Sequence, residues 1–504
     1  MELSSAGACG AFRKHQADAP ARARWSDFPP AGLRCLRRPP ATFSLATPLG
    51  CAQLGALLGP PAEPFPLKIP SDLCRLNPMR SLTLLLALTL ALSSARAEFR
   101  ASTVKVDISP KTPQWLMGYG ARQSTGIHDP IFHRIAAMDD GTTQVFIVAS
   151  DLCLFSPTVY DDFTAELKAE TGIEPKQVWW TVTHSHSTPE VGPPGMYDVL
   201  LKGRSDHPWN REYLQFIKSS LMAGIKEARA KLEPARIAIG TGMARANINR
   251  RARDLDGRIS LGLNPDGPTD RQIGLIRLER PDGSLLGLIT NYAMHGTVLG
   301  GSFMQISGDG PGITSAYVEE KLGATTLYVN GAAGNLAPIY TVQEARNARV
   351  LGEFRVLLGN KILEANRTLG PGTADTKLWL AETWIETPRK AGLGWSEELK
   401  KYGSKSGGGV DLVRIPVRVL RINDTVLWGS PVELFCEISN KVRQESPFRN
   451  TFFFGYSNGW IGYLPTAEAF RDGGYEPRTS PFSEQVEQDY LKGVQTFLEG
   501  MSRH

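Results

Sequence analysis

The sequence predicts an α/β fold in which a mixed β-sheet core is flanked by helices within one large domain. Three observations support this prediction. A continuous apolar run, Gln144–Ser150, is typical of a strand buried on both faces. An amphipathic stretch at about 211–231 repeats apolar residues at helical spacing. Turn sequences, Pro281–Ser284 and Asn423-Asp424, separate pairs of strand-like runs and predict antiparallel hairpins beside the alternating units.

The remaining elements follow from the same patterns. Residues rich in β-branched and aromatic side chains predict strands, and stripes of apolar residues predict helices. Strands are expected at 102–108, 133–139, 144–150, from Val178, and at 235–241, 272–279, 284–291, 325–330, 412–422 and 425–429. Helices are expected at about 158–171, 211–231, 312–322, 342–366 and 483–501. Ser483 is the expected N-cap of the last helix, and residues 403–409 form a glycine-rich connection.

Composition excludes a nucleic-acid-binding face. The chain has 504 residues, 41% of them hydrophobic, and a formal net charge of +5. Residues 1–97 carry 11 Lys and Arg against 5 Asp and Glu, which leaves 45 against 46 in residues 98–504. The positive charge therefore belongs to the N-terminal stretch, and the rest of the chain has no excess of cations to bind phosphates.

The first 97 residues differ from the rest in composition. Residues 1–78 are rich in Ala, Pro and Arg without periodicity, as expected of an over-extended gene start or a disordered segment. Residues 79–97 then combine a positive start, an apolar run and Ala95-x-Ala97, the pattern of a secretory signal peptide. A membrane anchor is the alternative, but the apolar run Leu82–Leu92 is too short to span a bilayer. We therefore expect a secreted or periplasmic protein that begins near Glu98.

Only two cysteines, Cys153 and Cys436, follow residue 97. Both lie in apolar surroundings, which favours buried free thiols over a disulfide, although spacing alone leaves both open. A zinc site built from several cysteines is excluded.

His184 and His186 end an apolar strand that opens at Val178. Side chains at i and i+2 share one face of a strand, so both imidazoles are expected to point the same way at the sheet edge. Two polar loop residues without a ligand would show the same pattern. His295 and Glu433 also follow apolar strands. Each has an ordinary structural explanation, a hydrogen-bonded histidine or a glutamate that caps a helix. Two imidazoles and a carboxylate are nevertheless a ligand set that zinc accepts.

Seven segments, in order along the chain, together resemble the neutral (non-lysosomal) ceramidase family, which comprises secreted zinc amidases that cleave the N-acyl bond of ceramide. The segments are Gly118-Tyr-Gly with Gly126-Ile-His128, Thr183-His-Ser-His-Ser-Thr-Pro189, Ala246-Asn-Ile-Asn-Arg250, Asn291-Tyr-Ala-Met-His295, Ser307-Gly-Asp309, Pro431-Val-Glu433, and Ser457-Asn458 with Tyr463-Leu-Pro-Thr466 and Gly474-Tyr475-Glu476.

The resemblance implies a Zn²⁺ ion held by four residues and a catalytic domain that spans residues 98–504. The implied ligands are His184, His295, Glu433 and Tyr463. His186, Arg250 and Tyr475 match family positions near the substrate and the developing oxyanion. Water activated by the metal would then attack the amide. A structural arginine at 250 and a core or rim aromatic at 475 are the alternatives.

The chain departs from the family pattern at three points. Ala337 stands where the family has a serine, which excludes a serine-dependent mechanism, and Thr188 stands where it has a glycine. The sequence also stops near the end of the catalytic region, without the family's C-terminal immunoglobulin-like domain. We expect a small lipid-like amide as substrate, with contact to a membrane surface to reach it and neither nucleic acid nor protein as partner. The alternatives are an esterase or amidase that acts on another exported metabolite, and a metal-binding pocket protein without turnover.

Overall fold

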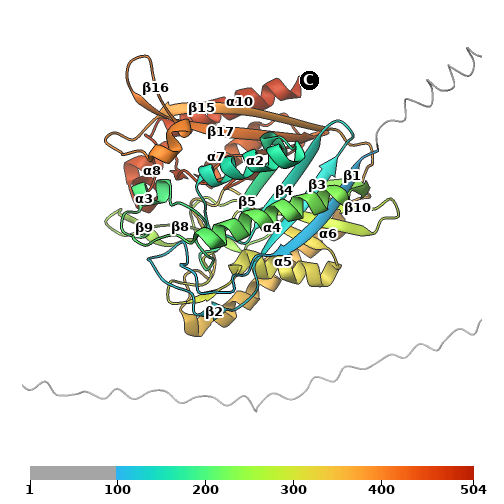
Figure 1. The fold of residues 1–504 in the computed structure, drawn as a ribbon. Helices are drawn as coiled ribbons and strands as arrows, with labels where there is room; N and C mark the ends of the chain where they lie inside the picture. Colours follow the sequence, from blue (N-terminus) through green and yellow to red (C-terminus); the bar gives the residue numbers. More distant parts are fainter. Residues whose placement is uncertain (1–97, 504) are drawn as a thin grey trace, which may run out of the picture. The chain divides into compact units, whose positions relative to one another are not determined.

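The computed structural model describes residues 98–503. The segment 1–78 and the signal peptide expected at 79–97 lie outside the described residues. Strands and helices alternate from β1 to α10, and the strands form several sheets with helices on their outer faces (Figure 1). The predicted α/β class with a mixed β core is confirmed. Within the described residues, no helix is both long enough and apolar enough to cross a membrane.

The first sheet has the strand order β5-β4-β3-β1-β6. Its strands are β1 (Arg100–Asp107), β3 (Phe132–Asp139), β4 (Gln144–Ser150), β5 (Val178–Val182) and β6 (Glu233–Pro234). Only the β4–β5 pair is parallel, so the sheet is mixed. Phe146 and Val148 face one apolar cluster and Val145 and Ile147 another, which is why β4 is apolar at successive positions. The helices α2 (Pro157–Thr171) and α4 (Arg211–Ala230) pack on the outer face.

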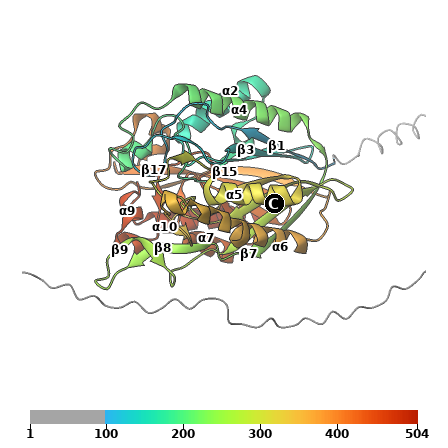
Figure 2. The same cartoon turned by 90° about the horizontal axis from the view of Figure 1, so that it is seen from below.

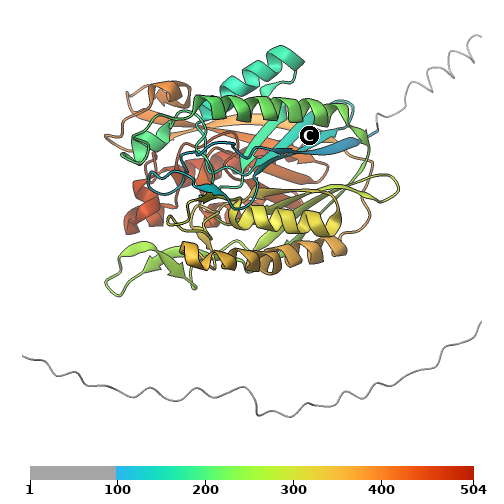
Figure 3. The ribbon, with the colours of Figure 1, turned by 60° about the horizontal axis from the view of Figure 1, so that its bottom comes forward.

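The second sheet has the order β13-β11-β10-β7. Its strands are β7 (Arg236–Met243), β10 (Gln272–Glu279), β11 (Leu285–Tyr292) and β13 (Thr325–Asn330). The inner face shares an apolar cluster with the first sheet, and the outer face packs on α5 (Asp309–Leu322) and α6 (Asn360–Thr368). The two sheets are thus stacked, with α2 and α4 on one outer side and α5 and α6 on the other (Figures 2 and 3).

A third sheet closes the remaining side of the core. It contains β15 (Leu378–Pro388), β16 (Gly403–Lys405), β17 (Asp411–Ile422), β18 (Thr425–Gly429) and β20 (Asn450–Phe454). The helices α7 (Cys436–Glu445) and α10 (Val486–Ser502) pack beside it (Figure 1). The strands of this sheet contribute to both apolar clusters that flank the first sheet.

Three small strand groups carry the functional segments. They are β2 (Gly126–Ile127) with β12 (Gln305–Ile306), β14 (Leu336–Pro338) with β8 (Asn247–Arg253) and β9 (Ile259–Asn264), and β19 (Glu433–Leu434) with β21 (Tyr463–Leu464). The short helical segments are η2 (Pro175–Gln177), α3 (Met196–Leu200), η3 (Ala345–Glu353), η4 (Arg355–Gly359), η5 (Glu397–Tyr402), α8 (Ala467–Asp472) and α9 (Tyr475–Arg478).

Two expectations about helices are wrong. The helix expected at 342–366 is a 3₁₀ segment, a π turn and α6 in succession. Val342 and Gln343 are not helical, because their N–H groups bond to the carbonyls of Thr297 and Val298. The last helix begins at Val486, and Ser483 does not cap it with its side chain. The free thiols are confirmed, since Cys153 and Cys436 are both buried and unpaired.

Candidate active site

Short pairings of the main chain bring the predicted ligand residues together. His184 follows β5 and His295 follows β11, and a parallel bridge joins their neighbours Ser185 and Gly296. Glu433 and Tyr463 begin β19 and β21 and face each other in the register of that parallel pair. His184 itself adopts a left-handed backbone conformation with φ of 62°, which is unfavourable for a non-glycine residue and is typical of functional sites.

The ligand atoms converge on one point. His295 Nε2 lies 3.1 Å and His184 Nε2 lies 3.4 Å from Oε2 of Glu433. One ligand atom from each residue lies within 4.8 Å of the other two. All three side chains are buried. The two imidazoles and the carboxylate, which come from distant parts of the sequence, thus lie close enough together to bind one ion.

The hydrogen bonds on the far side of the rings fix their tautomers. His184 Nδ1 lies 3.0 Å from the carbonyl oxygen of Cys153, and His295 Nδ1 lies 2.8 Å from that of Ala333. A carbonyl oxygen only accepts, so each Nδ1 carries the proton and each Nε2 presents a lone pair. Two lone pairs and a carboxylate oxygen at these distances repel each other unless a cation lies between them. The donor set therefore fits a metal ion, and the carbonyls orient the rings as is usual for metal-bound histidines.

Neighbouring groups favour the protonation states of His295 and Glu433 that bind a metal. Burial first, and then the nearby Arg250 and His184, lower the pKa of His295 to about 3, so its imidazole is neutral at neutral pH. The other oxygen of Glu433, Oε1, accepts a hydrogen bond of 2.9 Å from Trp460 Nε1. Tyr456 donates to Oε2 at 3.2 Å and stacks on the His184 ring. A neutral imidazole and a carboxylate held by donors are suitable metal ligands.

Tyr463 lies beside this group. Its Oη is 3.4 Å from His295 Nε2 and accepts a hydrogen bond of 3.0 Å from Arg250 Nη2. Burial raises the pKa of Tyr463 well above the usual value, although Arg250 lowers it. The phenol therefore lies at the rim of the ligand set, and its raised pKa keeps it protonated at neutral pH.

Arg250 is held by a buried ion pair. Its Nε donates to Glu476 Oε1 at 2.9 Å, and Arg251 Nη1 donates to Oε2 of the same carboxylate at 2.8 Å. Arg250 also lies near the ring of Tyr475. Burial raises the pKa of Tyr475, which keeps this phenol a hydrogen-bond donor. Arg250 and Tyr475 thus stand together beside the metal ligands.

His186 faces the same centre. Its Nε2 lies 3.2 Å from Nε2 of His184, and its Nδ1 is buried without a hydrogen-bond partner among the residues described. Burial, together with His184 and His295, lowers the pKa of His186 well below the usual value. Gly118 packs against the ring with φ of +103°, and a Cβ there would lie 2.4 Å from the His186 ring. Glycine is therefore needed at position 118 for this ring to keep its place.

A cavity of about 520 Å³ opens over these residues. Its lining consists of Gly118, Tyr119, His186, Arg204, Arg250, Leu261, Gly262, Thr297, Ala337, Thr341, Val342, Tyr463 and Tyr475. His186, Arg250, Tyr463 and Tyr475, all predicted from sequence, line it, and so does the alanine that replaces the family serine. A cavity of this size, with apolar walls and a few polar groups, is suited to a small ligand.

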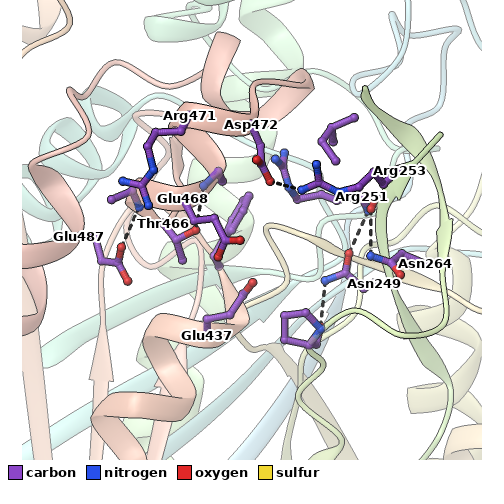
Figure 4. Close-up of a pocket in the computed structure, with 15 residues that line it drawn as sticks. Asn249, Arg251, Arg253, Asn264, Glu437, Thr466, Glu468, Arg471, Asp472 and Glu487 are labelled. Carbon is purple, nitrogen blue, oxygen red and sulfur yellow. Dashed lines mark hydrogen bonds and ion pairs between the residues drawn. The ribbon is translucent and has the colours of Figure 1, made fainter. Parts of the chain in front are cut away.

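A second, more polar pocket of about 400 Å³ lies near β8. Figure 4 shows Arg251 and Arg253 on one side of it and Glu468, Arg471 and Glu487 on the other. Successive side chains of a strand point to opposite faces, so Arg250 lines the first cavity and Arg251 the second. None of the residues predicted for the site lines this second pocket.

Sequence reasoning missed several residues that contact the site. Trp460 and Tyr456 bind Glu433, and Glu476 holds Arg250. Arg204 lines the cavity from the loop after α3. Glu476 stands inside a segment that carries the family resemblance, which is the one indication that could have identified it. The other three give no local pattern.

Comparisons with known proteins find similarity to neutral ceramidases. The profile of the family described as neutral/alkaline non-lysosomal ceramidase, N-terminal, matches residues 102–338. The neutral ceramidase of Pseudomonas aeruginosa is 24% identical over 485 residues, which cover 78% of this chain and 70% of that protein. The neutral ceramidase of Mycobacterium tuberculosis is 24% identical over 225 residues, 41% of this chain and 33% of the relative.

Solved structures show the same fold. The crystal structure of the Pseudomonas aeruginosa neutral ceramidase superposes with a TM-score of 0.65 at 19% identity, covering 80% of this chain and 75% of that one. A structure described as a ceramidase complexed with C2 gives a TM-score of 0.64 at 19% identity, covering 81% and 76%. Ceramidases are hydrolases of an amide bond. Over residues 102–338 the chain matches the neutral/alkaline non-lysosomal ceramidase family, and it is similar to neutral ceramidases in sequence and fold.

Proposed function

We propose that this chain is a secreted, zinc-dependent amidohydrolase that cleaves the N-acyl bond of ceramide or of a similar N-acyl lipid. One observation carries the proposal. His184, His295 and Glu433 direct two lone pairs and a carboxylate oxygen at one point beside a cavity that fits a small ligand. Such a set is costly to bury unless a cation joins it.

The donor chemistry favours zinc. Two imidazole nitrogens and one carboxylate oxygen are the ligand set of many catalytic zinc sites, which keep a further position open. Tyr463 is the fourth candidate ligand. When bound, zinc supplies Lewis acidity that acidifies water and polarises a carbonyl.

The chain's own residues then bind and orient the substrate. Arg250 and Tyr475 are donors beside the ligand set, where they can stabilise negative charge that develops on the amide oxygen. Glu476 fixes Arg250 in place before the substrate arrives. His186 presents a neutral imidazole to the same point. In the reaction water adds its oxygen to the acyl carbon, the C–N bond breaks, and a fatty acid and a free amine leave.

Ala337 shapes this proposal. It lines the cavity at the family's serine position and offers neither a nucleophile nor a hydrogen bond. Attack by water without an acyl-enzyme is therefore the proposed course. The same alanine motivates a second candidate function, a metal-binding pocket protein that has lost turnover.

Contact with a membrane surface is also proposed. Leu261 and Val342 line the cavity and are themselves more than half exposed, and Leu255 near the end of β8 is fully exposed. Exposed apolar side chains at the mouth of a cavity suit a lipid surface from which an acyl chain is drawn. Binding of the protein to phosphatidylcholine vesicles, weakened by Leu255→Ser, is the expected result.

The function is tested with the purified secreted protein. We expect close to one zinc ion per chain and release of fatty acid from labelled ceramide that stops when a chelator removes the metal. Zinc without turnover across amides and esters would instead support the pocket protein. A chain without bound zinc would contradict both. N-terminal sequencing of the secreted protein tests cleavage after Ala97.

A further inference from the structure

The charges around the catalytic cavity are unequal. Two of its lining residues, Arg204 and Arg250, are cationic, and none of the described residues that line it is an aspartate or glutamate. Arg250 is neutralised from behind by Glu476. Arg204 has no ion pair with a carboxylate anywhere in the described range, 98–503.

The surroundings of Arg204 are phenols. Arg204 interacts with the phenols of Tyr197 and Tyr475. A phenol is ordinarily neutral at neutral pH, so neither gives Arg204 a counter-charge. Arg204 is half-buried on the loop after α3.

A second guanidinium adds to the positive potential. Arg122 is buried behind Tyr119, where it bonds to the carbonyl oxygens of His186 and Met117. It too forms no ion pair with a carboxylate within the part of the chain that the structure describes. Buried or half-buried cations without a counter-ion are unfavourable, and an anion that enters the cavity would relieve this cost.

We propose that the cavity takes N-acyl amides whose amine part carries an anionic group, such as N-acyl amino acids or N-acyl aminosulfonates, and that Arg204 binds this anion. The proposal rests on the proposed amidohydrolase function and narrows its substrate class. Tyr475 packs edge-on against Tyr463, so a single phenol separates Arg204 from the residue beside His295. The anion would thus lie a few bonds from the scissile nitrogen, while Leu261 and Val342 accommodate the alkyl chain. Ceramide has no charged group and would leave Arg204 unpaired.

The test compares two substrates that differ in one charge. Zinc-loaded enzyme is assayed with N-lauroylglycine and with its neutral amide, N-lauroylglycinamide, and kcat/KM is measured for both. We expect wild type to prefer the glycine substrate, and Arg204→Gln to lower the glycine-to-glycinamide ratio roughly 10- to 100-fold, the contribution of a charge-assisted hydrogen bond. Arg204→Lys should restore part of the ratio, and added salt should reduce it in wild type. Arg449→Gln makes the same charge change at an exposed residue immediately before β20. It should leave the ratio unchanged.

The outcomes separate this inference from the function beneath it. Cleavage of both substrates with a ratio that Arg204→Gln does not change overturns the inference and leaves the amidohydrolase standing. Failure to cleave any amide overturns the proposed function. In that case calorimetric titration of N-lauroylglycine decides the inference: weaker binding to Arg204→Gln than to wild type supports it, and equal binding overturns it. Thermal unfolding of each variant confirms that it is folded.

Discussion

Nε2 of His295 and Oε2 of Glu433 lie 3.1 Å apart in the interior of the protein. Because Nδ1–H of the neutral His295 ring donates to the Ala333 carbonyl, Nε2 has no proton to donate to the carboxylate. Two acceptors at this distance indicate a cation. Replacing His295 or Glu433 should therefore lower the affinity for the metal more than it lowers the stability of the fold.

The first prediction concerns this pair. His295→Ala and Glu433→Gln should each weaken zinc binding by a factor of ten or more, because each removes a ligand from a three-residue set. Zinc per chain, measured by mass spectrometry after dialysis against a weak chelator, is the test. His128→Ala, at a half-exposed histidine paired with Asp129, should retain the metal. Full zinc occupancy in both ligand variants would contradict the assignment.

Tyr475 should act on turnover without affecting the metal. Tyr475→Phe removes only the hydroxyl, and loss of a donor to a developing oxyanion typically costs about 3 kcal/mol of barrier, or roughly 100-fold in kcat. Zinc content should not change. Tyr317→Phe is the control, since that phenol bonds to Asn360 at the surface. A variant with normal kcat would remove Tyr475 from the reaction.

Gly118 should be required for the position of His186. In Gly118→Ala the new Cβ would lie 2.4 Å from the His186 ring, and φ of +103° is unfavourable for alanine. The ring must shift, so we expect turnover to fall at least ten-fold with zinc retained. Gly120→Ala is a matched control, because a Cβ there meets nothing within 4 Å. Equal activities of the two variants would be evidence against this packing constraint.

Glu476 should stabilise the fold as well as the site. Its carboxylate is buried between Arg250 and Arg251, and breaking a buried ion pair by removing one partner typically costs about 3–5 kcal/mol. Glu476→Gln should thus lower the free energy of unfolding by that order, measured by urea denaturation, and slow turnover through Arg250. Glu468→Gln, at an exposed glutamate on α8, should unfold like wild type. A stable, active Glu476→Gln protein would refute the role.

The pH dependence of stability should reflect His133. Burial lowers its pKa from 6.5 to about 4, against a weaker opposing bond to the Ile217 carbonyl. Between these values the unfolded chain binds a proton that the folded chain does not. Acidification from pH 6.5 to 4 should consequently cost about 3 kcal/mol through this residue. His133→Gln should lose less stability than wild type over that range, and parallel urea-denaturation profiles would contradict the assignment.

Much of the secondary structure was predictable because local composition encodes it. The bounds of β4, β10, β13 and β18 agree with the expected runs, where apolar β-branched residues lie between turn residues. The helix expected at 342–366 failed for a tertiary reason. Val342 and Gln343 pair with the segment at Thr297 and Val298, and no local periodicity reveals that pairing.

The candidate site was predictable only in part. The His184 and His186 pair stands out locally, and His295 and Glu433 stand out at the ends of apolar strands. The family resemblance supplied Tyr463 and joined these residues into one ligand set. Trp460, Tyr456, Glu476 and Arg204 were not predicted, because their roles come from contacts with distant residues.

The sequence by itself determined the α/β class, the positions of most strands and helices, and the residue types that could hold a metal. Only the tertiary structure decided that two lone pairs and a carboxylate oxygen face one another, and that one cavity arginine has a carboxylate partner while the other has none. The reason is physical: distances between ligand atoms depend on which short strands pair across the whole chain, and local periodicity does not specify those pairings.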